Sequence, residues 1–245
     1  SVDSGDEESL AAAEMCRSQS KVPFKVVVNT GPKNCVAGWN AATAFSAGKV
    51  IIAVSDDFVP PQDWDSALLT DGMPAGWVDG EFAVHVEDGY VHNLLVIPII
   101  TRKRYNRFGY LYYPKYQSMF CDTELTEVAY RDNVVIGAKH LLFEHMHPDC
   151  GKRARDESDL SHAYIERWNS GEMLFKFRKA RGFPLDDGPL AGMAQEPVQT
   201  SESELKFAVY MQVTQDDFCL QEVCDRLFDE GCRDFFFAVP DVYWS

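Results

Sequence analysis

The sequence predicts an α/β fold in which a mixed, mainly parallel sheet is flanked by helices. Short β-branched or apolar runs at 24–28 and 50–54 alternate with helical segments along the first third of the chain. The run at 50–54 is apolar without interruption, which is typical of a parallel strand buried on both faces. A strand–helix–strand pattern also occupies 207–239. Because parallel strands joined by helices pack with right-handed crossovers, this alternation indicates an open sheet covered by helices.

The first third of the chain carries start and stop signals for its elements. Asp6 or Ser4 is a suitable N-cap for the first helix, because its oxygen can accept from unpaired backbone N–H groups in the first turn. The NTGP stretch at 29–32 ends the first strand as a turn, and Gly48 is expected at the C-cap of the second helix. The predicted elements are a helix over 7–20, a strand over 24–28, a helix over 36–47, a strand over 50–54 and a helix over 65–69.

The middle of the chain predicts further strands and a long helix. The charged stretch at 150–159 is expected to be a surface loop, and the helix that follows carries Tyr164, Trp168 and Phe175. The predicted elements are strands over 80–85, 94–100 and 134–142, a small helix starting over 104–108, and a helix over 159–181.

Composition divides the chain into a core, a linker and a C-terminal unit. We expect a core over 1–183, a linker over 184–206, and a strand–helix–strand unit within 207–245, because the middle segment is rich in Pro, Gly and Ser and has no periodicity. The elements of the last unit are a strand over 207–213, a helix over 216–230 and a strand over 234–239.

The C-terminal unit cannot bury both faces of its strands alone, so it must dock on another sheet. It either completes the core sheet by circular permutation, with 243–245 beside 1–3, or begins a truncated second domain. We favour the first interpretation, since a parallel sheet without its central strands leaves buried backbone groups unpaired.

Composition also narrows the classes of partner. With 38 acidic and 23 basic residues the 245-residue chain has a formal net charge of -15, which disfavours unaided binding to nucleic acid or anionic membrane. The densest basic stretch is 102–107, and it is interpreted equally well as a solvated surface or a phosphate contact. Seven cysteines without a CxxC pair are interpreted as reduced thiols, so we expect a cytoplasmic protein. The apolar runs are too short to predict a membrane span.

Two adjacent carboxylates follow the strand predicted at 50–54. Ser55, Asp56 and Asp57 stand at its carboxyl end, shortly before Pro60 and Pro61. Open α/β sheets bind ligands at the carboxyl ends of their strands. Carboxylate oxygens are also the ligands that hard divalent cations prefer, often shared with a substrate phosphate. This segment therefore predicts a metal site, although an ordinary Asp-rich turn is the alternative.

Several segments, in order and spacing, resemble the GT-A fold of inverting family-2 glycosyltransferases. These segments are VDSGDE, VVVNTG, AGWNAATAFSAGKVIIAVSDDF and the distal FEHMH, and the resemblance covers about 1–181. It implies a GT-A-like catalytic core and a transfer that depends on Mn²⁺ or Mg²⁺. The implied donor is a nucleotide-diphosphate sugar, with UDP or a similar pyrimidine nucleotide. The implied acceptor is a hydroxyl group on a glycan or, as an outside alternative, on a modified nucleic acid.

The resemblance also implies roles for residues that would contact the donor. Asp3 resembles the carboxylate that reads the nucleotide base, and Asp56 resembles the second Asp of the DxD metal motif. Val54 stands where that motif has its first Asp, and Asp57 is the candidate to replace the missing carboxylate. The further donor-binding candidates are Asn29, Lys33, Asn40 and Ser55.

Four later positions are candidates for the two remaining roles of the implied site. Asp122 resembles the general base toward the acceptor hydroxyl, with Glu124 as its rival, and His145 or else His147 resembles a late histidine ligand of the metal. A sugar transfer needs its leaving diphosphate neutralised, which a metal does as a Lewis acid, and it needs a base near the attacking hydroxyl. The two histidines flank Met146, so in an extended segment only one of them faces the site.

The same residues also fit other interpretations. Asp3 and Asp122 are also suitable helix caps. The substitution at Val54 is compatible with a non-catalytic GT-A-like module that binds a nucleotide or carbohydrate. A nucleotidyltransferase would use the same metal but attack the α-phosphate, and it normally carries a Gly-rich basic loop after its first strand, which 213–216 does not resemble.

Overall fold

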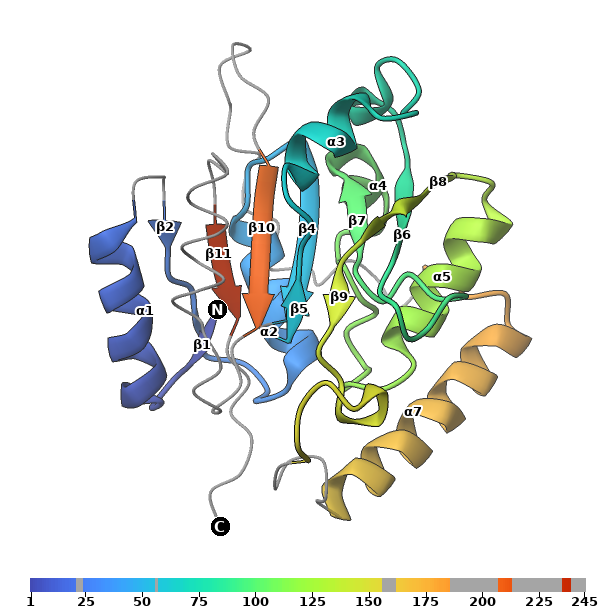
Figure 1. The fold of residues 1–245 in the computed structure, drawn as a ribbon. Helices are drawn as coiled ribbons and strands as arrows, with labels where there is room; N and C mark the ends of the chain where they lie inside the picture. The colour runs from blue at the N-terminus through green and yellow to red at the C-terminus, as the bar shows by residue number, and fades with distance from the viewer. Residues whose placement is uncertain (21–23, 56, 156–161, 186–206, 213–234, 239–245) are drawn as a thin grey trace.

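The fold is built on one long sheet with helices on both faces (Figure 1). The computed structural model describes residues 1–20, 24–55, 57–155, 162–185, 207–212 and 235–238. Within these residues the sheet has seven strands in the order β2-β11-β10-β4-β7-β6-β8. They span Phe24–Lys25, Phe235–Ala238, Phe207–Gln212, Val50–Ser55, Ile99–Thr101, Ala83–Glu87 and Val135–Leu142, respectively. Strand β7 is antiparallel to both neighbours and the other pairs are parallel, which confirms the predicted mixed, mainly parallel α/β sheet.

Strand β10 lies between β11 and β4, so the C-terminal strands belong to the main sheet. Its register with β4 is continuous, from Phe207 opposite Val50 to Gln212 opposite Ser55. The central strand β4 is thus paired on both edges, with β10 on one side and β7 on the other. The predicted helix over 216–230, the predicted linker beyond 185, and the expected meeting of 243–245 with 1–3 lie outside the described residues.

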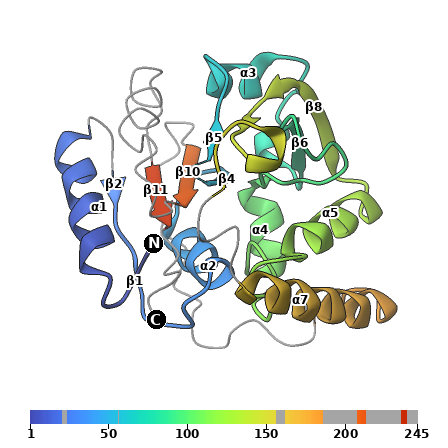
Figure 2. The ribbon, with the colours of Figure 1, turned by 60° about the horizontal axis from the view of Figure 1, so that its bottom comes forward.

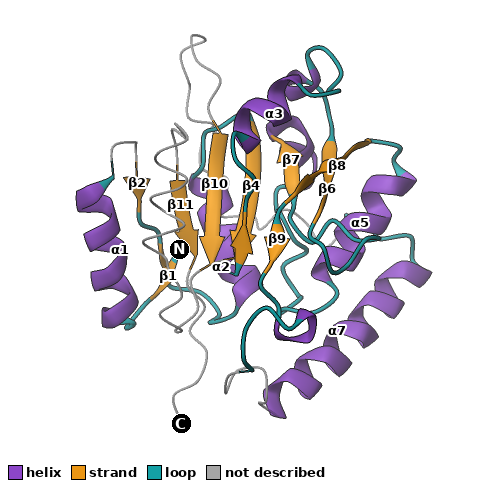
Figure 3. Ribbon diagram, in the orientation of Figure 1, coloured by secondary structure: helices purple, strands orange, loops and turns teal. Residues whose placement is uncertain are grey.

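The described helices cover the sheet, and α1 and α2 begin at side-chain caps (Figure 3). Asp6 accepts from the backbone N–H of Ser9 at 2.9 Å, and Asn34 accepts from that of Ala37 at 2.9 Å, which starts α1 and α2. No helix among the described residues has the length and apolar character to cross a bilayer. The α-helices are α1 (Glu7–Gln19), α2 (Cys35–Phe45), α3 (Trp64–Thr70), α4 (Arg102–Phe108), α5 (Cys121–Arg131) and α7 (His162–Ala180), with 3-10 turns η1 (Trp77–Asp79) and η2 (Pro148–Cys150).

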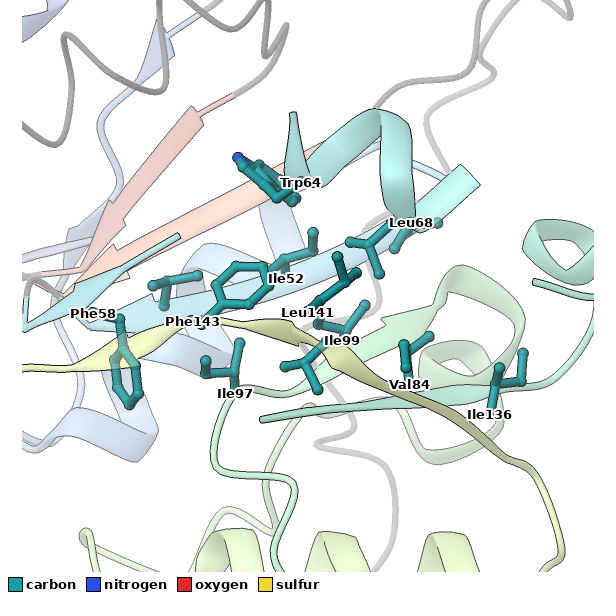
Figure 4. Packing of buried hydrophobic residues seen from close by; sticks show 14 of the residues in the cluster. Ile52, Phe58, Trp64, Leu68, Val84, Ile97, Ile99, Ile136, Leu141 and Phe143 are labelled. Atoms are coloured by element: carbon teal, nitrogen blue, oxygen red, sulfur yellow. The ribbon is translucent and has the colours of Figure 1, made fainter. Parts of the chain in front are cut away.

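Alternate residues of β4 serve two separate cores. Ile51 and Ala53 pack with residues of α2 and α5, whereas Ile52 packs on the opposite face with Trp64 and Leu68 of α3. Figure 4 shows this second cluster, where strand residues such as Ile52 and Ile99 lie among Phe143, Leu141 and the α3 side chains. Burial on both faces explains why β4 carries no polar residue before Ser55.

Among the described residues, two short two-stranded sheets are separate from the seven-stranded sheet. Strand β1 (Val2–Asp3) pairs in parallel with β3 (Val28–Asn29), and β5 (Phe58–Val59) pairs antiparallel with β9 (Glu144–His145). β5 follows β4 in the chain and β9 follows β8, so the second ladder joins the ends of two main strands. The strand predicted over 24–28 is therefore two strands in different sheets, β2 and β3.

Other boundaries differ from the predicted ones for local reasons. Helix α2 ends at Phe45 and not at residue 47, because its C-cap is Ser46 and not Gly48; the Ser46 hydroxyl donates to the carbonyl of Thr43 at 2.7 Å. The strand predicted over 94–100 is limited to β7, which starts after Pro98, a residue without a backbone N–H to donate. Arg104 of the basic stretch is buried and donates to Glu81 and Asp132 at 2.7 Å each, so it is an internal ion-pair residue.

A buried ion pair fastens α7 to α5. Arg178 of α7 and Glu124 of α5 are 2% and 6% exposed, and the guanidinium reaches both carboxylate oxygens at 2.7 and 2.8 Å. Tyr116 donates to the same carboxylate at 3.0 Å, and the guanidinium lies 3.3 Å from the ring centroid of Tyr113. Removing one partner would leave a buried charge uncompensated, which makes this contact sensitive to substitution.

We predict that Arg178→Ala lowers the free energy of unfolding by about 3–5 kcal/mol, because Glu124 loses its buried partner. The control is Lys179→Ala, one residue away, whose ion pair with Glu127 is exposed and contributes about 1 kcal/mol or less. Urea unfolding followed by circular dichroism measures both variants. Equal losses in the two variants would contradict this assignment.

Candidate functional site

The strand order of the sheet reverses between β10 and β4. From β10 the chain leads to β11 on one side, and from β4 it leads to β6, β7 and β8 on the other. In open α/β sheets a ligand binds outside the carboxyl ends of the strands at such a reversal. Figure 2 turns this edge toward the viewer, and the segments that follow β4 and β8 lie there. The candidate site is therefore built from the loops at this edge.

His145 in β9 is held by both its backbone and its ring. Its backbone N–H donates to the carbonyl of Asp88 at 2.9 Å, and it pairs with Phe58 in the β5–β9 ladder. Its ring stacks on the ring of Phe58, with centroids 4.1 Å apart and planes at 25°. The fold thus fixes the direction in which each ring nitrogen points.

The two ring nitrogens of His145 face two carboxylates. Nε2 lies 3.1 Å from Oδ2 of Asp57, which follows β4, and Nδ1 lies 3.3 Å from Oδ2 of Asp88, which follows β6. The side chain of Asp88 is 3% exposed, that of His145 12% and that of Asp57 27%. Segments after β4, β6 and β8 therefore meet at one imidazole.

This arrangement shifts the pKa of His145 upward. Burial by itself lowers the pKa, but the hydrogen bonds and charges of Asp57 and Asp88 outweigh it and raise the pKa of His145 to about 9. Burial raises the pKa of Asp88, yet hydrogen bonds from His145 and two backbone N–H groups give a net lowering. At neutral pH the group is an imidazolium between two carboxylates.

The chemistry of these donors fits the divalent metal that the resemblance implies. Oδ1 of Asp57 is buried and accepts no hydrogen bond from the described residues. A carboxylate oxygen and an imidazole nitrogen are both ligands of Mn²⁺, and Mg²⁺ accepts the carboxylate. The described residues contain no preassembled group of three or more His, Cys, Asp or Glu ligands. Asp57 and His145 would therefore supply part of a coordination shell, and substrate oxygens or water the remainder.

Asp3 and Asn29 form a second buried pair, at the ends of β1 and β3. Nδ2 of Asn29 donates to Oδ1 of Asp3 at 2.5 Å, and Asp3 is 3% exposed. Oδ1 of Asn29 accepts from the backbone N–H of Gly31 at 3.0 Å, which fixes the turn after β3. Two residues predicted to contact the donor are thus joined to each other, and Asp6, not Asp3, caps α1.

The remaining donor-binding candidates are placed differently. Asn40 lies within α2, where its Oδ1 accepts from the backbone N–H groups of Leu111 and Tyr112 and its Nδ2 donates to the carbonyl of Tyr112. Its amide is thus used to fasten the loop at 111–112 to α2. Lys33 is exposed on the loop before α2, and Ser55 is the last residue of β4. Asp56 lies outside the described residues.

The two candidate bases lie in the first turn of α5 but in different surroundings. Both carboxylate oxygens of Glu124 are bonded to Arg178, so this side chain fastens α7 and presents no vacant oxygen to a substrate. Asp122 accepts from the backbone N–H of Thr123 at 2.8 Å and is half-buried. Burial raises its pKa, and the N–H of Thr123 only partly opposes this. Of the two, Asp122 is chemically suited to accept a proton.

His147 belongs to an aromatic group beside His145. Its ring stacks on Tyr90 with centroids 4.8 Å apart, and its Nδ1 accepts from the backbone N–H of Asp149 at 3.1 Å. The rings of His145 and His147 are 5.1 Å apart between centroids. His145, not His147, contacts Asp57.

Asp88 is a site residue that the sequence analysis did not identify. The signal was present, because Glu87, Asp88 and Gly89 follow the apolar residues of β6 much as Ser55 and Asp57 follow those of β4. What the sequence lacks is any indication that β6 and β4 place these carboxylates on either side of one histidine.

Comparisons of this chain with family models, with curated proteins and with solved structures found no match. A functional assignment therefore depends on the geometry of the described residues.

We predict that His145→Gln destabilises the fold more at pH 6 than at pH 10. A folded pKa of about 9 means that the ionised histidine stabilises the fold fully below its unfolded pKa near 6.5 and that this contribution is lost as the pH rises through 9. The pH-dependent part is at most about 3 kcal/mol. Urea unfolding of both proteins at the two pH values measures it.

His92→Gln is the control for this measurement, because His92 makes an exposed ion pair with Glu87. Its loss of stability should be small and nearly independent of pH. A pH-independent effect of His145→Gln would show that the two carboxylates do not hold the imidazolium.

Proposed function

We propose that this chain is a metal-dependent glycosyltransferase that moves a sugar from a nucleotide-diphosphate sugar to an acceptor hydroxyl. The main support is the contact between Asp57 and His145, which are 88 residues apart in sequence. Oδ2 of Asp57 and Nε2 of His145 lie 3.1 Å apart at the edge where the strand order reverses. The mainly parallel sheet is compatible with the GT-A fold that the sequence resembles. The oxygen of Asp57 that is buried without a donor from the described residues supports a cation at this point.

The negative charge of the described site favours a cation, and a diphosphate could bind only together with one. Asp57 and Asp88 flank His145 at the carboxyl edge, so two carboxylates are already gathered there. A diphosphate would be repelled by these carboxylates unless a cation joined them. In the proposal Asp57 and His145, together with Asp56, would hold Mn²⁺ or Mg²⁺, which when bound would supply Lewis-acid neutralisation of the leaving diphosphate.

The remaining steps use two other carboxylates. Asp122 accepts the proton of the acceptor hydroxyl as it attacks the anomeric carbon, a role that its raised pKa supports. Direct attack opposite the leaving group gives inversion at that carbon. Asp3, fixed by Asn29, accepts a hydrogen bond from an N–H group of a pyrimidine base, and a carboxylate has enough lone pairs for both donors.

We predict that the wild-type chain hydrolyses at least one nucleotide-diphosphate sugar slowly, and only with Mn²⁺ or Mg²⁺. Water replaces the unknown acceptor in this assay, and release of the nucleotide is measured across a panel of donors. Asp57→Asn should lose the activity by about 100-fold or more, because the metal loses a charged ligand. Asp122→Asn should bind UDP with Mn²⁺ but hydrolyse the donor about 100-fold more slowly.

Asp79→Asn is the matched control, since Asp79 is an exposed carboxylate that pairs with Lys49. It should retain full activity. Metal-dependent binding of UDP without hydrolysis of any donor would favour a non-catalytic binding module. Hydrolysis that is insensitive to chelation of divalent metal would contradict the proposal.

A further inference from the structure

Asp88 has the geometry of a residue that orients another side chain. Its Oδ1 accepts from the backbone N–H groups of Tyr90 and Val91 at 2.9 and 2.7 Å, which fixes the plane of the carboxylate. Gly89 permits this turn because its φ is +76°. Oδ2 is then left facing Nδ1 of His145. The carboxylate is buried and fully engaged, so it is poorly placed to contact a substrate itself.

The same residue also holds the backbone of His145. Its carbonyl oxygen accepts from the N–H of His145 at 2.9 Å, next to the bond from the N–H of Phe143 to the carbonyl of Glu87 at 2.8 Å. Asp88 thus restrains His145 at two points, the main chain and Nδ1. With Phe58 stacked on the ring, Nε2 is left to face Asp57.

We infer that Asp88 is a positioning residue that directs Nε2 of His145 toward a divalent metal held by Asp57. The inference rests on the proposed function. A histidine that binds a metal through one nitrogen usually donates its other N–H to a carboxylate, which fixes the ring orientation and makes the bound nitrogen more basic. Here the Nδ1 of His145 faces such a carboxylate, and Nε2 faces a second carboxylate whose other oxygen is buried with no donor within the described part of the chain.

The alternative is that Asp88 only stabilises the fold as one side of an ion pair. The two roles differ in their dependence on His145. A positioning residue affects metal affinity through the imidazole, so its effect should vanish once the imidazole is removed. A purely structural residue would affect the site whether or not His145 is present. A double-mutant cycle separates these cases.

The test variant is Asp88→Asn. Its side-chain oxygen can still accept from the backbone N–H groups of Tyr90 and Val91, so the turn is retained. Its amide nitrogen cannot accept from Nδ1–H of His145. Glu87→Gln is the matched control, because Glu87 is the preceding carboxylate and pairs with His92 and Lys139 at the surface.

Binding of Mn²⁺ alone to the full chain is measured by electron paramagnetic resonance of the free ion, without any substrate. Asp88→Asn and His145→Gln should each weaken Mn²⁺ binding by about 10–100-fold, and the double variant should bind no more weakly than His145→Gln. Glu87→Gln should bind as the wild type does. In ¹⁵N-histidine spectra, Mn²⁺ should broaden the ring signals of His145 at low metal in the wild type and only at higher metal in Asp88→Asn.

Each other outcome overturns the inference. If Asp88→Asn binds Mn²⁺ within twofold of the wild type, or weakens binding equally in the His145→Gln background, Asp88 does not act through His145, and the proposed function stands without it. If the wild type binds no Mn²⁺, the inference fails; metal-dependent donor hydrolysis then decides the proposed function separately.

Discussion

The pairing of β4 with β10 is the constraint on which the rest of the structure depends. β4 is apolar over most of its length and buried on both faces, so its backbone groups can be satisfied only by strands on both sides. One neighbour, β7, comes from the middle of the chain, and the other comes from residues 207–212. This pairing creates the reversal of strand order and thereby determines which edge of the sheet can bind a ligand.

Charged side chains lie close together at the same edge and compensate one another. The segments after β4 and β6 bring Asp57 and Asp88 to opposite ring nitrogens of His145, which lies between them as a cation. An imidazolium satisfies both carboxylates in the free protein, while a divalent metal would replace its Nε2 proton and satisfy the remaining oxygen of Asp57. Under the proposed function, stability and metal binding would therefore depend on the same three side chains. By contrast, both carboxylate oxygens of Glu124 are bonded to Arg178, so this buried pair has a structural role only.

Local signals predicted much of the fold but not its long-range contacts. The apolar run of β4 and the cap residues Asp6 and Asn34 made β4, α1 and α2 predictable apart from their exact ends. The antiparallel insertion of β7 was not predictable, because a three-residue strand of two isoleucines and a threonine does not indicate its direction. The sequence also cannot show whether the amide of Asn40 binds a ligand or the protein itself. Its structural role is evident only from its hydrogen bonds to the backbone at 111–112. Asp57 and His145 were predicted as site residues, whereas Asp88 was found only through the packing of β6 beside β8.

The central claim is that a divalent metal binds between Asp57 and His145 at the carboxyl edge of β4. Crystals of the full chain grown with Mn²⁺ and UDP, with anomalous differences measured at the manganese absorption edge, test it most directly. If Asp57 and His145 hold the ion, an anomalous peak lies within coordination distance of Oδ1 of Asp57 and Nε2 of His145, with UDP phosphate oxygens on the same ion. A map in which Mn²⁺ and UDP bind elsewhere, while Nε2 of His145 keeps its direct contact with Asp57, would contradict it.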